Sequence, residues 1–218
     1  LALGVAGIDE MLMTGELHLP IPATIVAGPI FRGELTVMLL LLAVTLVLVG
    51  PAWCSHLCYL GAWDDAFSRR RRKPTALPFW RRLVQPASLL LVIVVALGLR
   101  LAGASATVAT AAGLAVGVIG VIVMATWSRR TGAMVHCLTV CPIGWIATTA
   151  GRISPFRVRI DDSCDACGGC TPACRYDALS AEDIARRRPA LSCTLCGDCI
   201  GRCPRSSLHY RWLGLKPH

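Results

Sequence analysis

The chain has 218 residues, of which 55% are hydrophobic and only 16% are charged. A soluble domain of this size usually carries about a quarter charged residues, so the composition argues against an ordinary soluble domain. The formal net charge is +9, yet the sequence contains no nucleic-acid-binding motif, phosphate loop or catalytic triad, and we expect neither a nucleic-acid partner nor an independent enzyme. The composition changes along the chain, which divides it into residues 1–34, 35–150 and 151–218.

Residues 1–34 are predicted to form an acidic external or interfacial segment. Three acidic residues precede position 17, and three prolines argue against a straight spanning helix: Pro20, Pro22 and Pro29. The chain begins at Leu1, inside a short apolar run without an initiator methionine, so we expect an upstream segment to precede it.

Residues 35–150 contain three apolar stretches of about 20 residues, the length that an α-helix needs to cross a bilayer. They are 35–52, 83–102 and 106–127, and the last two are joined by Gly103, Ala104 and Ser105, which predicts an antiparallel hairpin. Helices of a soluble core are the alternative, but uninterrupted apolar runs of this length are rare there. The predicted fold class is therefore a mainly α membrane protein with about three transmembrane helices and a small α+β C-terminal domain.

Lys and Arg gather on one side of the predicted spans. The loop 64–82 contains seven of them, and Arg129 and Arg130 follow the third stretch. The opposite side offers only Arg32 and Arg100. The excess of basic residues in cytoplasmic loops predicts a multi-pass protein of the cytoplasmic (inner) membrane, embedded in its lipid bilayer, whose C-terminal domain faces the cytoplasm.

Residues 151–218 contain the spacing Cys-x2-Cys-x2-Cys-x3-Cys twice, as in bacterial ferredoxins with two 4Fe–4S clusters. In that arrangement the fourth cysteine of each run ligates the other cluster. Set one is therefore predicted to be Cys164, Cys167, Cys170 and Cys203. Set two is predicted to be Cys193, Cys196, Cys199 and Cys174.

Zinc is the alternative for these cysteines, since Cys-x2-Cys pairs also bind zinc. A tetrahedral zinc site needs only two such pairs, so four regularly spaced cysteines in each run favour clusters. One departure from the ferredoxin pattern is Arg175, which follows Cys174 where proline is usual and could raise the potential of the neighbouring cluster. We predict a ferredoxin-like domain in residues 151–218 with two 4Fe–4S clusters.

Four cysteines remain, in two Cys-x3-Cys pairs that follow the first and third predicted spans, and we name them the helix-end cysteines. They are Cys54, Cys58, Cys137 and Cys141. On a helix, residues i and i+4 share one face, so two pairs brought together would supply four thiolates. A further cluster, another metal, a dithiol relay and free structural cysteines are the alternatives. The neighbouring His56 and His136 could take protons on quinol oxidation, ligate a metal, or be interfacial residues.

With these motifs the chain resembles the membrane-bound polyferredoxins of the NapH and MauN type and, more distantly, NosR-type regulators and oxidase accessory ferredoxins. The likeness covers residues 22–212 and rests on the two Cys-x3-Cys motifs, the arginine-rich loop and the double ferredoxin spacing. Tyr59 departs from the family, which has proline after its first Cys-x3-Cys motif.

The resemblance implies electron transfer between the membrane quinone pool and a partner redox protein, with quinol as a donor. It also implies a further helix before residue 1. A second hypothesis, from a different class, is an accessory or sensory membrane ferredoxin, for example one that handles metal for an oxidase and depends chiefly on the helix-end cysteines.

Overall fold

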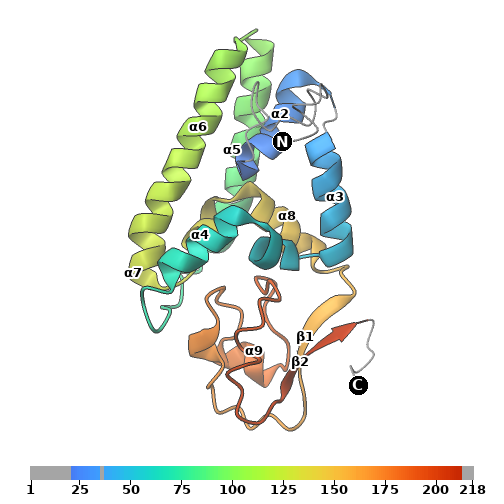
Figure 1. Cartoon of the computed structure of the whole chain (residues 1–218), viewed down its shortest axis with the longest axis vertical. Helices are drawn as coiled ribbons and strands as arrows, with labels where there is room; N and C mark the ends of the chain where they lie inside the picture. Colours follow the sequence, from blue (N-terminus) through green and yellow to red (C-terminus); the bar gives the residue numbers. More distant parts are fainter. Residues whose placement is uncertain (1–20, 35–36, 213–218) are drawn as a thin grey trace, which may run out of the picture.

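We describe a computed structural model of the chain, which describes residues 21–34 and 37–212. The three acidic residues before position 17, part of the predicted external or interfacial segment, lie outside the described residues. Helices form the upper part of the molecule in Figure 1, a small domain with two strands forms the lower part, and α4 (Tyr59–Ser68) and α8 (Pro142–Ala150) lie between them.

The helices α5 (Arg81–Leu101) and α6 (Ala106–Val123) form the predicted antiparallel hairpin, which turns at Gly103 with φ of +61°. The second arm continues through the π-helical turn η3 (Met124–Ser128) and α7 (Arg129–Thr131). Two stretches, Leu83–Leu101 and Ala106–Thr131, are long and apolar enough to cross a membrane. Only 6% of the first apolar window and 17% of the second are buried, whereas the core helix of a soluble domain is mostly buried.

The helix α3 (Val37–Val49) is shorter than the predicted span 35–52. Its 13 residues extend about 20 Å, against about 30 Å for a bilayer core, so the prediction of three full-length spans is not confirmed. Gly50 ends the helix because it adopts φ of +57°, a left-handed conformation that favours glycine, and Pro51 follows it.

Residues 22–32 form the helix α2 (Pro22–Arg32), within the segment that was predicted to be external or interfacial and to contain no straight spanning helix. The prolines permit this helix because Pro22 occupies the first helical position, where its missing N–H costs nothing, and only Pro29 lies inside the helix. The N–H of Gly33 donates to the Pro29 carbonyl at 2.8 Å and closes the helix. The helix has 11 residues, too few to span a bilayer, and it packs against α5, α6 and α8.

The C-terminal domain lies at the end of the helices that is remote from the α5–α6 turn (Figure 1). Its strands β1 (Phe156–Ile160) and β2 (Leu208–Trp212) pair antiparallel, so the two ends of the domain close on each other. Between them lie the 3-10 turn η5 (Thr171–Ala173) and α9 (Ala181–Ala185), which begins with a capping box between Ser180 and Asp183. The small α+β domain thus follows the predicted fold class.

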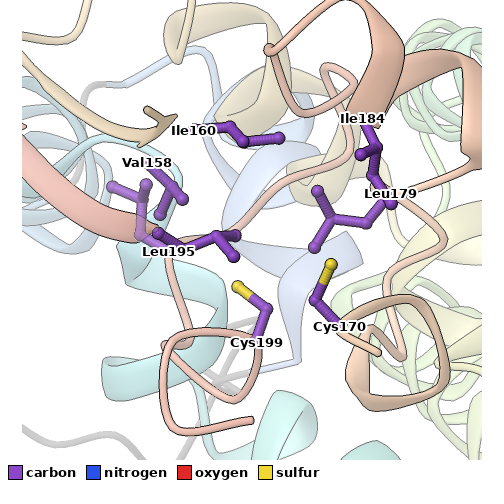
Figure 2. Close-up of a cluster of buried hydrophobic side chains, with 8 residues drawn as sticks. Val158, Ile160, Cys170, Leu179, Ile184, Leu195 and Cys199 are labelled. Carbon is purple, nitrogen blue, oxygen red and sulfur yellow. The ribbon is translucent and has the colours of Figure 1, made fainter. Parts of the chain in front are cut away.

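The core of this domain surrounds two of the cysteines. Alternate residues of β1, Val158 and Ile160, are buried and pack with Leu195, and the thiols of Cys170 and Cys199 point into the same apolar cluster (Figure 2). Five further cysteines or apolar residues of the two cysteine runs pack against it: Cys164, Cys174, Cys193, Ile200 and Cys203. The apolar core and the predicted cluster ligands are therefore one structure.

Candidate iron–sulfur sites

The two Cys-x3-Cys motifs form the same local structure, 83 residues apart. Each begins as a π-helical turn, η2 (Trp53–Leu57) or η4 (His136–Val140), a rare form that is frequent at functional sites. The second cysteine is extended, with φ and ψ of −84° and 117° at Cys58 and −73° and 116° at Cys141, and α4 or α8 begins directly after it. Because of this extended residue, the paired cysteines do not share one face of an α-helix.

A glycine three residues after each motif allows the following helix to fold back onto the turn. A Cβ atom at Gly61 would lie 2.1 Å from the carbonyl oxygen of Cys54. One at Gly144 would lie 2.5 Å from that of Cys137, which also accepts a hydrogen bond from Gln85 at 3.1 Å. A residue with a Cβ atom could not come this close to either carbonyl oxygen unless the backbone moved.

The two motifs are built against each other, and the structure brings the four helix-end cysteines together. The helix after the first motif contacts the second turn, and the helix after the second motif contacts the first turn. Asp64 of α4 accepts a hydrogen bond from the Cys137 N–H at 3.0 Å. Cys54 and Cys141 share one buried apolar cluster with Ile143. Every pairing among the four thiols interacts electrostatically.

Burial holds these cysteines as neutral thiols in the absence of a cation. It raises the pKa of Cys54 and of Cys137 well above the usual range, and that of Cys141 to about 12. The backbone N–H groups of Ile143 and Gly144 act in the opposite direction on the pKa of Cys141. Three buried thiols and the partly buried Cys58 can become thiolates together only when a metal centre supplies compensating positive charge.

The two neighbouring histidines have different surroundings. His136 is buried against Gly120 of α6, and neither ring nitrogen has a hydrogen-bond partner among residues 21–34 and 37–212. Burial lowers its pKa to about 4, which keeps the ring neutral. The ring of His56 lies with Nε2 3.3 Å from the Leu195 carbonyl of the C-terminal domain. Their roles as ligands or proton acceptors stay predictions.

The two cysteine runs of the C-terminal domain also have matching backbones, offset by 29 residues. Positive φ angles recur at equivalent positions: Ala166 and Leu195, Gly168 and Gly197, Asp177 and Ser206. The fourth cysteine of each run accepts a hydrogen bond from the N–H four residues later, Ala178 to Cys174 at 3.2 Å and Ser207 to Cys203 at 3.3 Å. Such bonds to sulfur orient metal ligands and tune their basicity.

Electrostatic neighbours within the domain sort the cysteines into the two predicted sets. Burial raises the pKa of Cys170. This thiol also interacts electrostatically with the other members of set one: Cys203, Cys164 and Cys167. Burial raises the pKa of Cys199 to about 12. The strongest electrostatic neighbours of this thiol are the other members of set two: Cys174, Cys193 and Cys196. The structure thus gathers the cysteines in the crossed arrangement, and their ligand roles stay a prediction.

The residues gathered in the C-terminal domain are thiol donors. In the described part of the chain, no group of three or more His, Cys, Asp or Glu side chains is placed to hold a single metal ion. Four thiols in each of the two C-terminal sets are the donor set that 4Fe–4S clusters use.

An apolar contact joins the helix-end cysteines to set two. Cys137 and Tyr176 belong to one buried cluster, and Cys174 and Cys196 pack against it. The buried Tyr176 has its pKa raised well above the usual range, first by burial and then by Cys137. Sequence reasoning missed Tyr176 because a single aromatic residue after a cysteine carries no distinctive pattern.

Polar contacts fix the C-terminal domain onto the helices around this cluster. Ser55 in the first turn donates to the Thr194 carbonyl at 2.6 Å, and Arg81 forms an ion pair with Asp177 at 2.9 Å. Arg175 donates through one nitrogen to three carbonyl oxygens, those of Ser68, Arg71 and Gly132. Arg175, which stands where ferredoxins usually have proline, therefore connects the C-terminal domain to the helices.

Two segments of the chain, residues 24–76 and 111–161, match the family model described as a 4Fe–4S binding domain. The chain is similar to 4Fe–4S ferredoxin-type proteins. Each matched segment contains one Cys-x3-Cys motif, and both end before Cys164, so the match falls on the helix-end cysteines. No curated protein and no solved structure matches the chain. The similarity supports iron–sulfur clusters and an electron-transfer role.

Proposed function

We propose that the protein is a membrane-anchored iron–sulfur electron-transfer subunit that works between the quinone pool and a partner redox protein. The observation that carries the proposal is the joining of exposed apolar helices to two sets of four gathered cysteines in one chain. When bound, 4Fe–4S clusters supply one-electron carriers. The chain's own residues bind them, shield them from water and donate backbone hydrogen bonds to their ligands.

The membrane anchor is the α5–α6 hairpin. Its outward surface consists of large apolar side chains, such as Leu90 at 62% exposure and Leu101 at 86%, whose contact with water would be unfavourable. The basic segment after α4 lies beside the C-terminal domain, because Arg69 forms an ion pair with Asp198 at 2.7 Å. By the excess of positive charge, both belong on the cytoplasmic side of the inner membrane.

Quinol as a donor comes from the resemblance to the NapH and MauN type and is supported by one cavity. The cavity has a volume of about 240 Å³, lies between α2, α5 and α6, and reaches Val140 in the second cysteine turn. Its lining is almost wholly apolar, and the hydroxyls of Thr24 and Ser88 already donate to backbone carbonyls. It therefore suits a hydrocarbon tail at the edge of the cysteine site.

The alternative, a factor that hands metal to an oxidase, is less well supported. Such a factor needs thiols that a partner can reach, whereas Cys54, Cys137 and Cys141 are each no more than 8% exposed.

The experiment that tests the proposal uses the full chain in washed membranes and in liposomes. We expect the iron–sulfur absorbance to stay with the membranes after alkaline carbonate extraction, and to bleach on addition of a quinol under anaerobic conditions. Release of the protein by carbonate would contradict the anchor. Clusters that dithionite reduces but no quinol reduces would contradict the quinone pool as donor.

A further inference from the structure

We infer that the four helix-end cysteines together hold one further 4Fe–4S cluster, which the two Cys-x3-Cys turns share. The inference deepens the proposed function and rests on it, since it adds a third centre to the same chain. It is the site at which the helices meet the C-terminal domain.

The number of cysteines in each matched segment requires sharing. A cubane cluster is held by four protein ligands. Residues 24–76 contain only Cys54 and Cys58, and residues 111–161 contain only Cys137 and Cys141. Neither segment can therefore complete a site alone, although both match a 4Fe–4S binding domain.

The packing supplies what sharing needs, because each motif is completed by the other. The helix that follows Cys58 contacts the second turn, and Asp64 on that helix fixes the backbone of Cys137. The helix that follows Cys141 contacts the first turn. This reciprocal arrangement gathers the four thiols at one site, where Cys58 is partly buried and the other three are buried.

The second cysteine of each motif lies at the N-terminus of a helix. Cys58 and Cys141 stand directly before α4 and α8, helices of 10 and 9 residues, whose N-terminal N–H groups carry partial positive charge. Such N–H groups stabilise an anionic centre that is bound at a helix N-terminus. Cysteines used only as small apolar residues would need neither this position nor the close approach at Gly61 and Gly144.

The shared site borders set two rather than set one. Cys137 packs with Tyr176 in one buried cluster, and Cys174 and Cys196 of set two lie against that cluster. Cys167 of set one is exposed to solvent. The three centres are therefore ordered from the helices outwards as the shared site, set two and set one.

The experiment counts iron and acid-labile sulfide in the full chain, purified anaerobically in detergent. We expect about twelve irons per chain, at four for each cluster. Cys54→Ser and Cys137→Ser should each lower the count to about eight, and the double variant should also contain about eight because both residues serve one cluster. Leu57→Ser, at an exposed position of the same turn, is the matched control and should keep all twelve.

A second readout reports the order of the centres. The EPR signal of the set-two cluster should sharpen in Cys54→Ser because it loses a magnetic neighbour. About eight irons in the parent chain and no loss in either variant would overturn the inference and leave the proposed function standing. About sixteen irons, falling by four with each substitution, would overturn sharing. A chain without iron would overturn the proposed function itself.

Discussion

Replacing Gly144 by alanine should destabilise the second cysteine turn. The added Cβ would lie 2.5 Å from the Cys137 carbonyl oxygen and 3.0 Å from Gln85 Nε2, and real Cβ contacts stay above 3.0 Å. The backbone must therefore shift and weaken the hydrogen bond from Gln85 to that carbonyl. Overpacking of this kind costs about 1–3 kcal/mol, and about 2 kcal/mol lowers the Tm of a chain of this size by about 4–8 °C.

The assay is thermal unfolding of the purified protein in detergent, with iron content measured in parallel. Gly98→Ala is the matched control, because Gly98 lies in the helix α5 with nothing within 4 Å of the added Cβ. It should leave the Tm unchanged or raise it slightly, since alanine favours helix over glycine by about 1 kcal/mol. An unchanged Tm in Gly144→Ala, or an equal fall in Gly98→Ala, would refute the packing argument.

Three other substitutions test the C-terminal domain and its attachment, each by the shift in Tm. Gly197→Ala places a side chain at a φ of +86° and 2.6 Å from the Tyr210 hydroxyl oxygen, so it should lower the free energy of unfolding by about 2 kcal/mol. Gly201→Ala is the control and should change the stability little, because nothing lies within 4 Å of the added Cβ. Arg175→Met removes the donor shared by three carbonyls and should lower stability by about 2 kcal/mol, and an equal effect of Arg202→Met at an exposed site would contradict this. Arg69→Gln breaks two ion pairs, with Asp65 and Asp198. Because all three side chains are about a third or more exposed, it should cost about 1 kcal/mol or less, with no remaining effect in about 1 M salt.

The sequence predicted the parts of this molecule that depend on spacing and on long apolar runs. The hairpin at Gly103 follows from two uninterrupted apolar stretches and a connection too short for any other path. The grouping of the C-terminal cysteines follows from a spacing that repeats after 29 residues. Patterns of this kind are local, so a single chain contains all the information that they need.

Features that depend on contacts between distant segments could not be predicted. The helix at 22–32 was missed because the prolines argue locally against a helix, while packing against α5 and α6 stabilises it. The helix α3 ends before the predicted end of the span 35–52 because Gly50, with a positive φ, and Pro51 follow it within an otherwise apolar run. The helix-end cysteines converge through contacts between distant segments, such as the hydrogen bond between Asp64 and Cys137, 73 residues apart in the chain.

The central claim, a membrane-anchored iron–sulfur electron carrier, is tested most directly by an EPR-monitored redox titration of the full chain in washed membranes. The account predicts reversible signals of several interacting 4Fe–4S clusters. When the cysteines of both C-terminal sets are replaced by serine, the signals of those two clusters and their magnetic interaction should disappear from the membranes. Membranes that contain the chain with zinc in place of iron, and that give no reversible cluster signal at any potential, would contradict it.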